Sequence, residues 1–423
     1  MELKTKTAFK QTEVGVIPED WNLVPFDKVF TFYSTSNYSK AQMSEEDDVG
    51  CIHYGLIHAI SNTQYDLNDG IKYYVSSEQT KYELVRDGDV IMVDASEDLE
   101  GINKSVEVFG VNNKKYISGL HTYLLRDKGG LLADKFRGIV LNSQLVKNQM
   151  LQLAVGMKVF GVSKSQIIKV KIPLPPTLQE QKAIATALSD VDALIQGLEA
   201  LIAKKKDIKQ GAMQELLTPP HKGGKRLPGF TDEWVEKRLE NVGEIITGGT
   251  PSTFNNLFWG GDIPWVTPTD IGENKDISEC ERYLSKDGLK AVRKLPKDSL
   301  LVTCIASIGK NAILRKDGAC NQQINAVVPN ELNNVDFLYY LIELNNNVIK
   351  SKAGITATLM VSKKVFSDIS FDFPPTLEEQ NDIAKILSDM DIELEQLEIK
   401  KAKYQDIKQG MMQELLTGKT RLI

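Results

Sequence analysis

Apolar side chains recur at alternating steps of four and three residues in two separate stretches of the chain. In the first stretch they are Ile184, Leu188, Val191, Ile195, Leu198 and Ile202. In the second they are Ile383, Leu387, Met390, Leu394 and Leu397. This is the spacing of the a and d positions of a coiled coil. A helix that packs only on its own domain would carry a similar stripe, but the equivalence of the two seams favours two long helices that pair with each other.

Both helices have a start signal. Thr177 and Thr376 each follow Pro-Pro and each precede a Glu by three residues, which is the spacing of a capping box. A helix from Thr177 to Leu217 would be roughly 60 Å long at about 1.5 Å per residue. A second apolar series departs in phase from the seam, and its members are Ile208, Ala212 and Leu216. We therefore expect the helix end to contact a different partner, such as the other domain.

The helices belong to a longer repeat with an offset of 199 residues and no gap. The matching pairs are 175–181 with 374–380, 188–190 with 387–389, 207–211 with 406–410, and 214–218 with 413–417. A weaker repeat around Trp21 and Trp234 marks the start of each unit. The chain therefore holds one design twice, in which a variable segment is followed by a nearly invariant helix.

The variable segments have a different pattern. Residues 89–93 and 299–305 are β-branched and apolar and are bounded by Gly, Asp and Pro, which predicts buried strands, whereas 336–342 predicts a helix. The fold class we expect is α+β, with two globular domains separated by two long helices. The predicted boundaries are 1–172 for the first globular domain, 173–218 for the first helix, 219–372 for a linker and the second globular domain, and 373–423 for the second helix and tail.

Bulk properties narrow the class of protein. The chain has 423 residues, of which 42% are hydrophobic and 26% are charged, as expected for a soluble globular protein. It has no apolar run near the roughly 18 residues that span a bilayer and no secretion signal, so we expect a cytoplasmic protein without a membrane partner. The four cysteines lack metal-ligand spacing, so we expect reduced thiols and no metal.

The charge distribution changes the meaning of the net charge. A net charge of −6 argues mildly against a nucleic-acid partner. Residues 135–179 and 344–367, however, contain lysines and no acid, and these two windows precede the two Pro-Pro-Thr sequences. Residues 299–316 are also free of acids. A solvated lysine-rich face is the ordinary explanation, but its recurrence at matched positions favours binding to a polyanion such as DNA.

Motifs that would indicate catalysis are missing. The sequence lacks a Walker A motif, HExxH, GxSxG and a GxGxxG cofactor loop. Its four histidines offer few general bases. The loop 248–252, Gly-Gly-Thr-Pro-Ser, could bind a phosphate through backbone N–H groups. A fused DNA methyltransferase or nuclease would need a cofactor loop or a metal-binding acidic cluster, and the sequence has neither.

The repeated motifs make the chain resemble the specificity (S) subunit of Type I restriction–modification systems. The resemblance rests on the Pro-Pro-Thr-Leu-x-Glu-Gln helix starts, the Leu-Ser-Asp centres, the Gln-Glu-Leu-Leu-Thr ends and the Leu-Pro-Gly-Phe entry before Trp234. The loop 248–252 followed by Ile263-Pro264-Trp265 also resembles the opening of a target-recognition domain of that family. The first variable segment lacks both of these features.

The resemblance implies a non-catalytic DNA-binding subunit. Each variable segment would be a target-recognition domain that reads half of a bipartite sequence in double-stranded DNA, and the two helices would pair antiparallel as a spacer. Two methyltransferase (M) subunits and the restriction/translocase (R) subunits would be the partners. S-adenosylmethionine and ATP would belong to those partners, so no cofactor is expected here. The alternatives are a coiled-coil assembly scaffold without DNA recognition and a DNA reader of another defence system.

The candidate DNA-binding residues are polar or basic and lie in loop-like or acid-free stretches. In the first domain they are Lys104, Lys158, Ser163 and Lys164. In the second domain they are Thr250, Ser252, Lys310, Gln322, Thr356 and Lys363. Lysines at such positions would contact phosphates, and hydroxyl or amide groups could contact phosphates or base edges.

Overall fold

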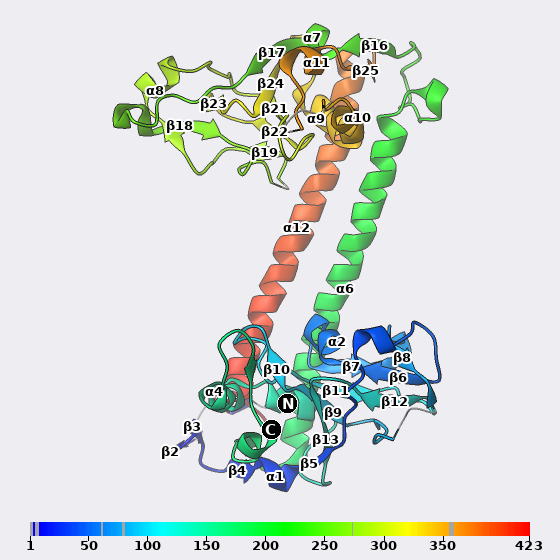
Figure 1. The fold of residues 1–423 in the computed structure, drawn as a ribbon, viewed down its shortest axis with the longest axis vertical. Coiled ribbons are helices and arrows are strands. Elements are labelled where there is room, and N and C mark those ends of the chain that lie inside the picture. Colours follow the sequence, from blue (N-terminus) through cyan, green and yellow to red (C-terminus); the bar gives the residue numbers. More distant parts are fainter. Residues whose placement is uncertain (1–2, 5–7, 61, 78–80, 273, 355–358) are drawn as a thin grey trace. The chain divides into compact units, whose positions relative to one another are not determined.

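The structure is a computed structural model that describes all residues except 1–2, 5–7, 61, 78–80, 273 and 355–358 (Figure 1). The chain divides into two compact units. The first unit contains residues 1–199 and 400–423, and the second unit contains residues 200–399. Each unit therefore holds one variable segment, the first half of the helix that follows it and the second half of the other repeat's helix.

The first unit is built on a five-stranded sheet. Its strand order is β5 (Phe30–Tyr33), β13 (Thr122–Asp127), β9 (Val90–Val93), β11 (Ser105–Phe109) and β7 (Gln64–Asp66). All neighbours are antiparallel except β11 and β7, which are parallel. A three-stranded sheet of β12 (Lys115–Ser118), β6 (Val49–Ile52) and β8 (Tyr74–Val75) lies beside it in the chain's first unit (Figure 1).

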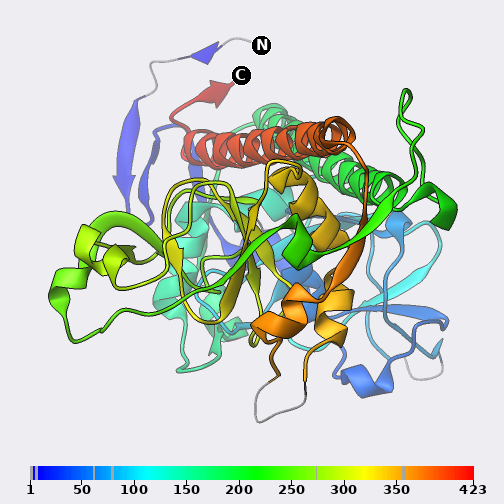
Figure 2. The same cartoon turned by 90° about the horizontal axis from the view of Figure 1, so that it is seen from above.

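Short helices and strand pairs complete the first unit. The helices are α1 (Phe26–Val29), α2 (Tyr54–Ala59), α3 (Phe136–Leu141), α4 (Gln144–Leu153) and α5 (Lys164–Ile167). The two-stranded pairs are β2 (Phe9–Thr12) with β3 (Gly15–Pro18), β4 (Asn22–Pro25) with β15 (Lys171–Leu174), and β10 (Ala95–Ser96) with β14 (Phe160–Gly161). Strand β1 (Leu3–Lys4) pairs with β26 (Arg421–Leu422), and Figure 2 shows these two strands side by side.

The second unit repeats this plan. Its five-stranded sheet has the order β17 (Gly243–Thr247), β24 (Ile324–Pro329), β21 (Ser299–Thr303), β22 (Asn311–Leu314) and β19 (Asp276–Ile277). The last pair is again parallel and the others are antiparallel. Its three-stranded sheet has the order β20 (Tyr283–Leu284), β18 (Trp259–Val266) and β23 (Ala319–Cys320).

The remaining elements of the second unit are mostly helices. They are α7 (Leu239–Val242), α8 (Lys286–Lys290), α9 (Val335–Leu344), α10 (Asn346–Ser351) and α11 (Lys363–Ser367), with β16 (Val235–Arg238) paired to β25 (Ser370–Phe373). The strands predicted at 89–93 and 299–305 are therefore confirmed as β9 and β21, and the helix predicted at 336–342 is confirmed as α9.

The long helices are α6 (Leu178–Leu216) and α12 (Leu377–Leu415), with 39 residues each. They run antiparallel in both units. In the first unit Lys408 of α12 pairs with Asp192 of α6, and in the second unit Lys209 of α6 pairs with Asp391 of α12. Figure 2 shows the two helices side by side. These two ion pairs are related by the 199-residue offset, so the repeat seen in the sequence is also a repeat of contacts.

The predicted apolar stripe is buried over most of its length: all six residues of α6 are buried, as are Ile383 and Leu387 of α12, whereas Leu394 and Leu397 are half-buried. Its first residues pack on the domain cores, because Ile184 and Leu188 lie in the core of the first unit, Ile383 and Leu387 lie in the core of the second, and Met390 packs against the latter. The helix ends also meet the other repeat's domain, as the phase shift predicts. Met213 and Leu217 lie in the core of the second unit, and Leu415 and Leu416 lie in the core of the first. Ile208, which was assigned to that contact, is exposed instead.

The capping box is only half formed, because the Glu of the repeated motif has another partner. The Thr177 hydroxyl accepts the N–H of Glu180, as expected of a cap. The Glu180 carboxylate, however, is buried against the guanidinium of Arg421. In the second unit the carboxylate of Glu379 accepts two bonds from Arg226, at 3.1 and 2.8 Å. Each motif Glu therefore fixes the segment that follows the other repeat's helix.

The Gln of the motif fastens the loop before the short helix of each domain. Gln181 accepts the N–H of Ala133 at 2.9 Å and donates to the carbonyl oxygen of Leu131 at 3.1 Å. Gln380 accepts the N–H of Asn334 at 3.0 Å and donates to the carbonyl oxygen of Leu332 at 3.3 Å. The repeated Glu-Gln thus ties three chain segments together in each unit, which explains why the sequence carries it twice.

Candidate nucleic-acid interface

The acid-free window of the first unit is less basic in three dimensions than in sequence. Arg137 donates to Glu107 at 2.9 Å and also pairs with Asp127 and Asp134, all outside or at the edge of the window. Lys171 pairs with Glu13. Burial is the largest influence on Glu107 and raises the pKa of its carboxyl, although Arg137 and two backbone N–H groups bind it. These cations stabilise the fold and are not available to a polyanion.

Lys158, Ser163 and Lys164 lie on consecutive exposed parts of the first unit. Lys158 is at the tip of a hairpin closed by β14, and Ser163 is the N-cap of α5, where its hydroxyl contacts the Gln166 side chain at 3.0 Å. The ammonium of Lys164 lies 4.8 Å from the ring centre of Phe32. In the part of the chain that the structure describes, no carboxylate is within ion-pair distance of Lys158 or Lys164, so both charges are open to an anion.

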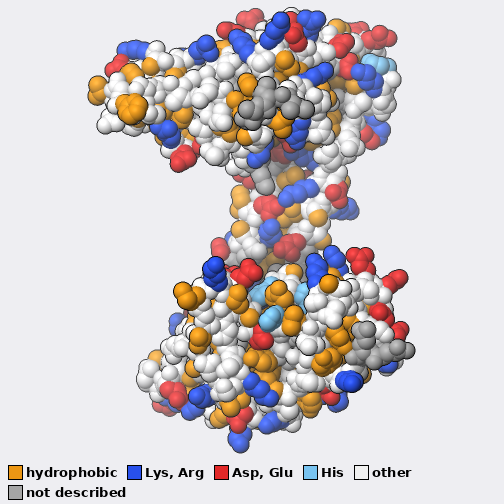
Figure 3. Space-filling model, viewed as in Figure 1, with side chains coloured by type: hydrophobic (Ala, Val, Ile, Leu, Met, Phe, Trp, Pro, Cys, Tyr) orange, Lys and Arg blue, Asp and Glu red, His pale blue; other side chains and the backbone are white. Residues whose placement is uncertain are grey.

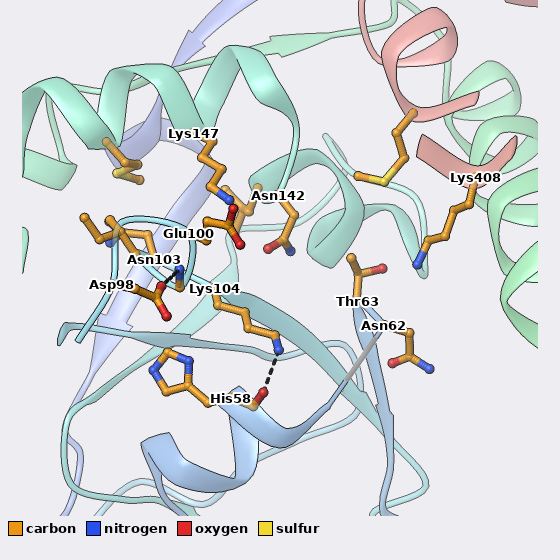
Figure 4. Close-up of a pocket in the computed structure, with 15 residues that line it drawn as sticks. His58, Asn62, Thr63, Asp98, Glu100, Asn103, Lys104, Asn142, Lys147 and Lys408 are labelled. Carbon is orange, nitrogen blue, oxygen red and sulfur yellow. Dashed lines mark hydrogen bonds between the residues drawn. The ribbon is translucent and has the colours of Figure 1, made fainter. Parts of the chain in front are cut away.

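Lys104 lies in a separate place, a cavity of about 420 Å³ in the first unit. Figure 4 shows its ammonium pointing at the backbone carbonyl of His58, to which it donates at 2.9 Å. Burial lowers the pKa of Lys104. Two further lysines, Lys147 and Lys408, line the same cavity together with Asp98 and Glu100. Lys104 therefore lines a cavity to which Lys158 and Lys164 do not belong.

In the second unit three of the candidate residues come together. The Thr250 hydroxyl donates to the amide oxygen of Gln322 at 2.6 Å, and both side chains are exposed. The carbonyl oxygen of Ser252 accepts the indole N–H of Trp259 at 3.2 Å. The indole N–H of Trp265 binds the carbonyl oxygen of Gly249 at 2.9 Å. Two tryptophans thus hold the loop that presents Thr250 and Ser252 beside Gln322.

The backbone N–H groups at the start of this loop serve the fold. Gly248 donates to Ile324 at 3.1 Å, and Gly249 donates to Cys320 at 2.8 Å. A side chain at Gly248 would place its Cβ 2.2 Å from the carbonyl oxygen of Asn321. The close approach of two backbones explains the glycine at position 248. The N–H groups of Gly248 and Gly249 are thus engaged within the unit and are not available to a phosphate.

Backbone hydrogen bonds bring two more candidates near the same place. Cys304 donates to Gln323 at 2.8 Å, and Val361 donates to Cys304 at 2.9 Å. The segments that carry Gln322, Lys310 and Lys363 are thereby joined. Lys310 is exposed, and Lys363 is the exposed first residue of α11. Thr356 lies outside the described residues.

Ser163-Lys164 and Ser362-Lys363 are equivalent in the repeat, and the structure gives them equivalent positions. Each serine precedes a short helix as its N-cap, and each lysine is the first residue of that helix. The same local motif therefore orients an exposed lysine in both units. Lys164 and Lys363 are the best-matched pair among the candidate residues.

One cation that sequence patterns did not indicate is Arg282. Its guanidinium lies 3.8 Å from the ring centre of Trp259 and 5.0 Å from that of Trp265. Stacking of this kind holds a planar cation at the surface. The acids Glu279 and Glu281 precede it in the sequence, so Arg282 lies outside the acid-free windows.

The surface has no single basic face in the view of Figure 3. Lysine and arginine side chains occur at several places on each unit, with acidic side chains between them. Among the described residues, no group of three or more His, Cys, Asp or Glu side chains could hold a metal ion. No described helix is long and apolar enough to cross a membrane.

Comparisons with known proteins agree on one family. A family model described as Type I restriction modification DNA specificity domain matches residues 18–208 and again 231–408. The putative type I restriction enzyme MjaX specificity subunit of Methanocaldococcus jannaschii is 27% identical over 428 residues, which are 98% of this chain and 97% of the relative. The MjaIX specificity subunit of the same organism is 32% identical over 165 residues, 38% of each chain. A crystal structure of a Type I S subunit from M. genitalium has a TM-score of 0.58 at 16% identity and covers 93% of this chain and 96% of that one.

Proposed function

The chain belongs to the family of Type I restriction–modification specificity subunits, and on this premise we propose that it reads a bipartite DNA target and directs its partner subunits there. The observation that carries the proposal is the duplicated unit. Each unit has the same order of strand positions in its five-stranded sheet, the same contacts of the motif Glu and Gln side chains, and the same Ser-Lys helix start. Two readers of one design are what a target with two half-sites requires.

The second unit offers the clearest reading surface. Thr250 and Gln322 present a hydroxyl and an amide side by side, and Gln is suited to paired hydrogen bonds with adenine. Lys310 and Lys363 are exposed cations joined to this site through the backbone, and they are suited to phosphate contacts. In the first unit the equivalent contacts with DNA would be made by Lys158, Ser163 and Lys164. We propose that Lys104 acts only indirectly, since its ammonium is bound to a carbonyl within the unit.

The paired helices would set the distance between half-sites. A helix of 39 residues is about 58 Å long at roughly 1.5 Å per residue, and each base pair adds about 3.4 Å along DNA. A continuous helix pair keeps its length, whereas a flexible linker does not. Insertion of one heptad into both helices should lengthen the recognised gap and leave both half-site sequences unchanged. An unchanged gap in such a variant would refute the spacer role.

The partners we propose are double-stranded DNA, two methyltransferase subunits and the restriction/translocase subunits of the full complex. Methyl transfer, cleavage and their cofactors would belong to those subunits, and this chain would act without a catalytic site of its own, in the cytoplasm. The domain boundaries at 172, 218 and 372 stay predictions of the sequence repeat.

The deciding experiment is methylome sequencing of cells that carry this chain with its methyltransferase. We expect one methylated motif with two fixed parts separated by a gap of constant length. A Thr250→Val/Gln322→Leu variant should lose specificity in one part only. A continuous motif, or methylation that does not depend on this chain, would contradict the proposal. A scaffold without a DNA role predicts no specific binding at all.

A further inference from the structure

A hairpin of the first unit, residues 154–161, ends in an apolar tip. Met157 at the tip is 97% exposed, and on the two arms of the hairpin Val155 is 70% exposed and Val159 is 54% exposed. Three large apolar side chains at alternate positions of one exposed loop are costly to hydrate, and such a group marks a binding surface. The proposed phosphate contacts do not explain why these apolar side chains are exposed.

The base of the hairpin is held firmly. Val155 and Gly161 exchange two backbone hydrogen bonds, at 3.0 and 3.1 Å. Strand β14 pairs with β10 through Gly161 opposite Ala95 and Phe160 opposite Ser96. Ala154 and Phe160 pack against the core of the first unit. The tip therefore projects from a fixed base, so its exposure is a property of the folded unit.

The turn itself requires a glycine. Gly156 has a φ of +155°, and a Cβ at this position would lie 1.9 Å from the carbonyl oxygen of Val159. Any side chain here would clash with backbone, which cannot move without opening the hairpin. Gly156 thus fixes the direction in which Met157 points and offers a way to change the tip without changing its chemistry.

The charge around the tip is suited to a polyanion. Lys158 is part of the tip, and Lys164 follows the hairpin within the acid-free window 135–179. Beside the paired strand β10, Asp94 contacts the His121 ring at 3.2 Å and Asp98 accepts the N–H of Gly101 at 2.6 Å, whereas Glu97 and Glu100 are exposed. The hairpin itself carries the positive charge of Lys158 and is followed by Lys164, and an apolar tip with this charge suits DNA.

We propose that this hairpin is a wedge, which inserts Met157 at one base step of the target while Lys158 contacts the neighbouring phosphate. Methionine is among the side chains that part stacked bases in this way, and the bend that results brings more of the duplex to the protein. The proposal rests on the proposed function, because it concerns how the first unit holds its half-site.

The experiment uses the full chain assembled with its methyltransferase subunits and DNA that carries the methylome-defined target. The fluorescent base 2-aminopurine replaces each base of both half-sites in turn, and the base that the methyltransferase itself extrudes is left out. We expect fluorescence to rise at one step within one half-site. Met157→Ser should abolish that rise and weaken binding at least about tenfold, the factor that burying one methionine side chain is worth.

Two further variants control for composition and shape. Leu99→Ser removes an apolar side chain that is 51% exposed but lies between Asp98 and Glu100, and it should change neither the fluorescence nor the affinity. Gly156→Ala keeps Met157 and should still abolish the rise, because the tip can no longer hold its direction.

The outcomes separate the wedge from the proposed function. Specific binding with no fluorescent step, or with a step that persists in Met157→Ser, overturns the wedge and leaves the DNA-reading function intact. Loss of methyltransferase from purified Met157→Ser assemblies also overturns it, because the tip would then dock a protein. Absence of specific binding by the unmodified assembly overturns the proposed function itself.

Discussion

The two units share a fold but reverse the polarity of one ion pair, which is nearly buried in the first unit and half-buried in the second. In the first unit strand β11 supplies the acid, Glu107, and helix α3 supplies Arg137. In the second unit Arg315, just after strand β22, donates to Asp336 of helix α9 at 2.6 Å. Arg137 and Asp336 are both the second residue of their helix, and the two strands occupy the same place in their sheets. The architecture therefore demands a helix-to-strand ion pair here, but not a particular direction for it.

A second contrast concerns the Arg that binds the motif Glu. In the second unit Arg226 belongs to the linker between repeats, and Trp234 adds an indole N–H to Glu379 at 3.4 Å. In the first unit Arg421 comes from beyond the second helix and also pairs with Asp20 at 2.9 Å. The Trp21 indole N–H, by contrast, has no partner among the described residues. The same Arg–Glu contact is thus made by the linker between the repeats in the second unit and by the segment after α12 in the first unit.

The largest effect is expected where this contact is broken in one unit only. Arg421→Met would leave Glu180 buried without its cation, and breaking one side of a buried pair costs about 3–5 kcal/mol. Hydrogen exchange followed by mass spectrometry should show loss of protection in the first unit and little change in the second. Arg226→Met should give the mirror result.

A double variant isolates the cause of this loss. Glu180→Gln combined with Arg421→Met removes the orphaned charge and should recover most of the lost protection. Equal loss in both units, or no recovery in the double variant, would show that Arg421 acts through something other than Glu180.

An intermediate effect is expected at the proposed reading surface of the second unit, where Thr250 and Gln322 are hydrogen-bonded to each other. Gln322→Leu should cost about 1–3 kcal/mol of discrimination, the value of a good side-chain to base contact. Competition binding with DNA altered in either half-site would measure it. Relaxed reading of both halves would mean that Gln322 supports the fold and does not read bases.

The reversed ion pair predicts opposite responses to acid. For Asp336, burial raises the pKa but Lys275 and Arg315 outweigh it, so the pKa is lowered in the fold. Its contribution is present above the unfolded pKa and is lost as pH falls through the folded pKa. The pKa of Glu107 is raised by burial, so its contribution is present at low pH and is lost as pH rises through the folded pKa.

Urea unfolding of single variants at neutral pH and near pH 4, about the range of carboxyl pKa values, would measure these slopes. The destabilisation by Asp336→Asn should shrink on acidification, whereas that by Glu107→Gln should grow. If the destabilisation changed with pH in the same direction for both variants, the two ion pairs would not differ in their response to acid.

The smallest effect is expected where the units agree. Lys164→Gln and Lys363→Gln should each weaken binding to all DNA sequences alike and reduce the salt slope by roughly 1. Lys104→Gln should leave the slope unchanged, because that ammonium is bound to His58. A sequence-dependent loss for Lys164→Gln would place it at a base edge and not at a phosphate.

The sequence predicted those parts of the fold that depend on neighbours along the chain. Seam spacing gave both long helices, and β-branched runs gave β9 and β21, because each pattern reflects burial within one element. It could not reveal the partner of Glu180, since Arg421 lies 241 residues away. For the same reason, the number of lysines and arginines in the window 135–179 exceeds the number of free positive charges. Arg137, for example, is bound to Glu107, which lies outside the window.

The candidate site was predictable only in part. Lys158, Ser163 and Lys164 stay predictions that rest on the charge and hydroxyl groups of one window, whereas the contact between Thr250 and Gln322 joins separate loops and is revealed by the fold. The sequence does not indicate the exposed tip at Met157, because a methionine two positions from a valine on each side ordinarily predicts burial. Exposure of an apolar side chain is a property of the fold, and only the structure reveals it.

The crossing of each helix end into the other repeat's core imposes an order on synthesis. Residues 200–399, which form the second unit, can all be present while the ribosome is still translating 400–423. The first unit must wait for Leu415, Leu416 and Arg421, although its variable segment emerged much earlier. The repeat made first is therefore completed last, and a premature stop codon after residue 399 would damage the reader encoded at the beginning of the message.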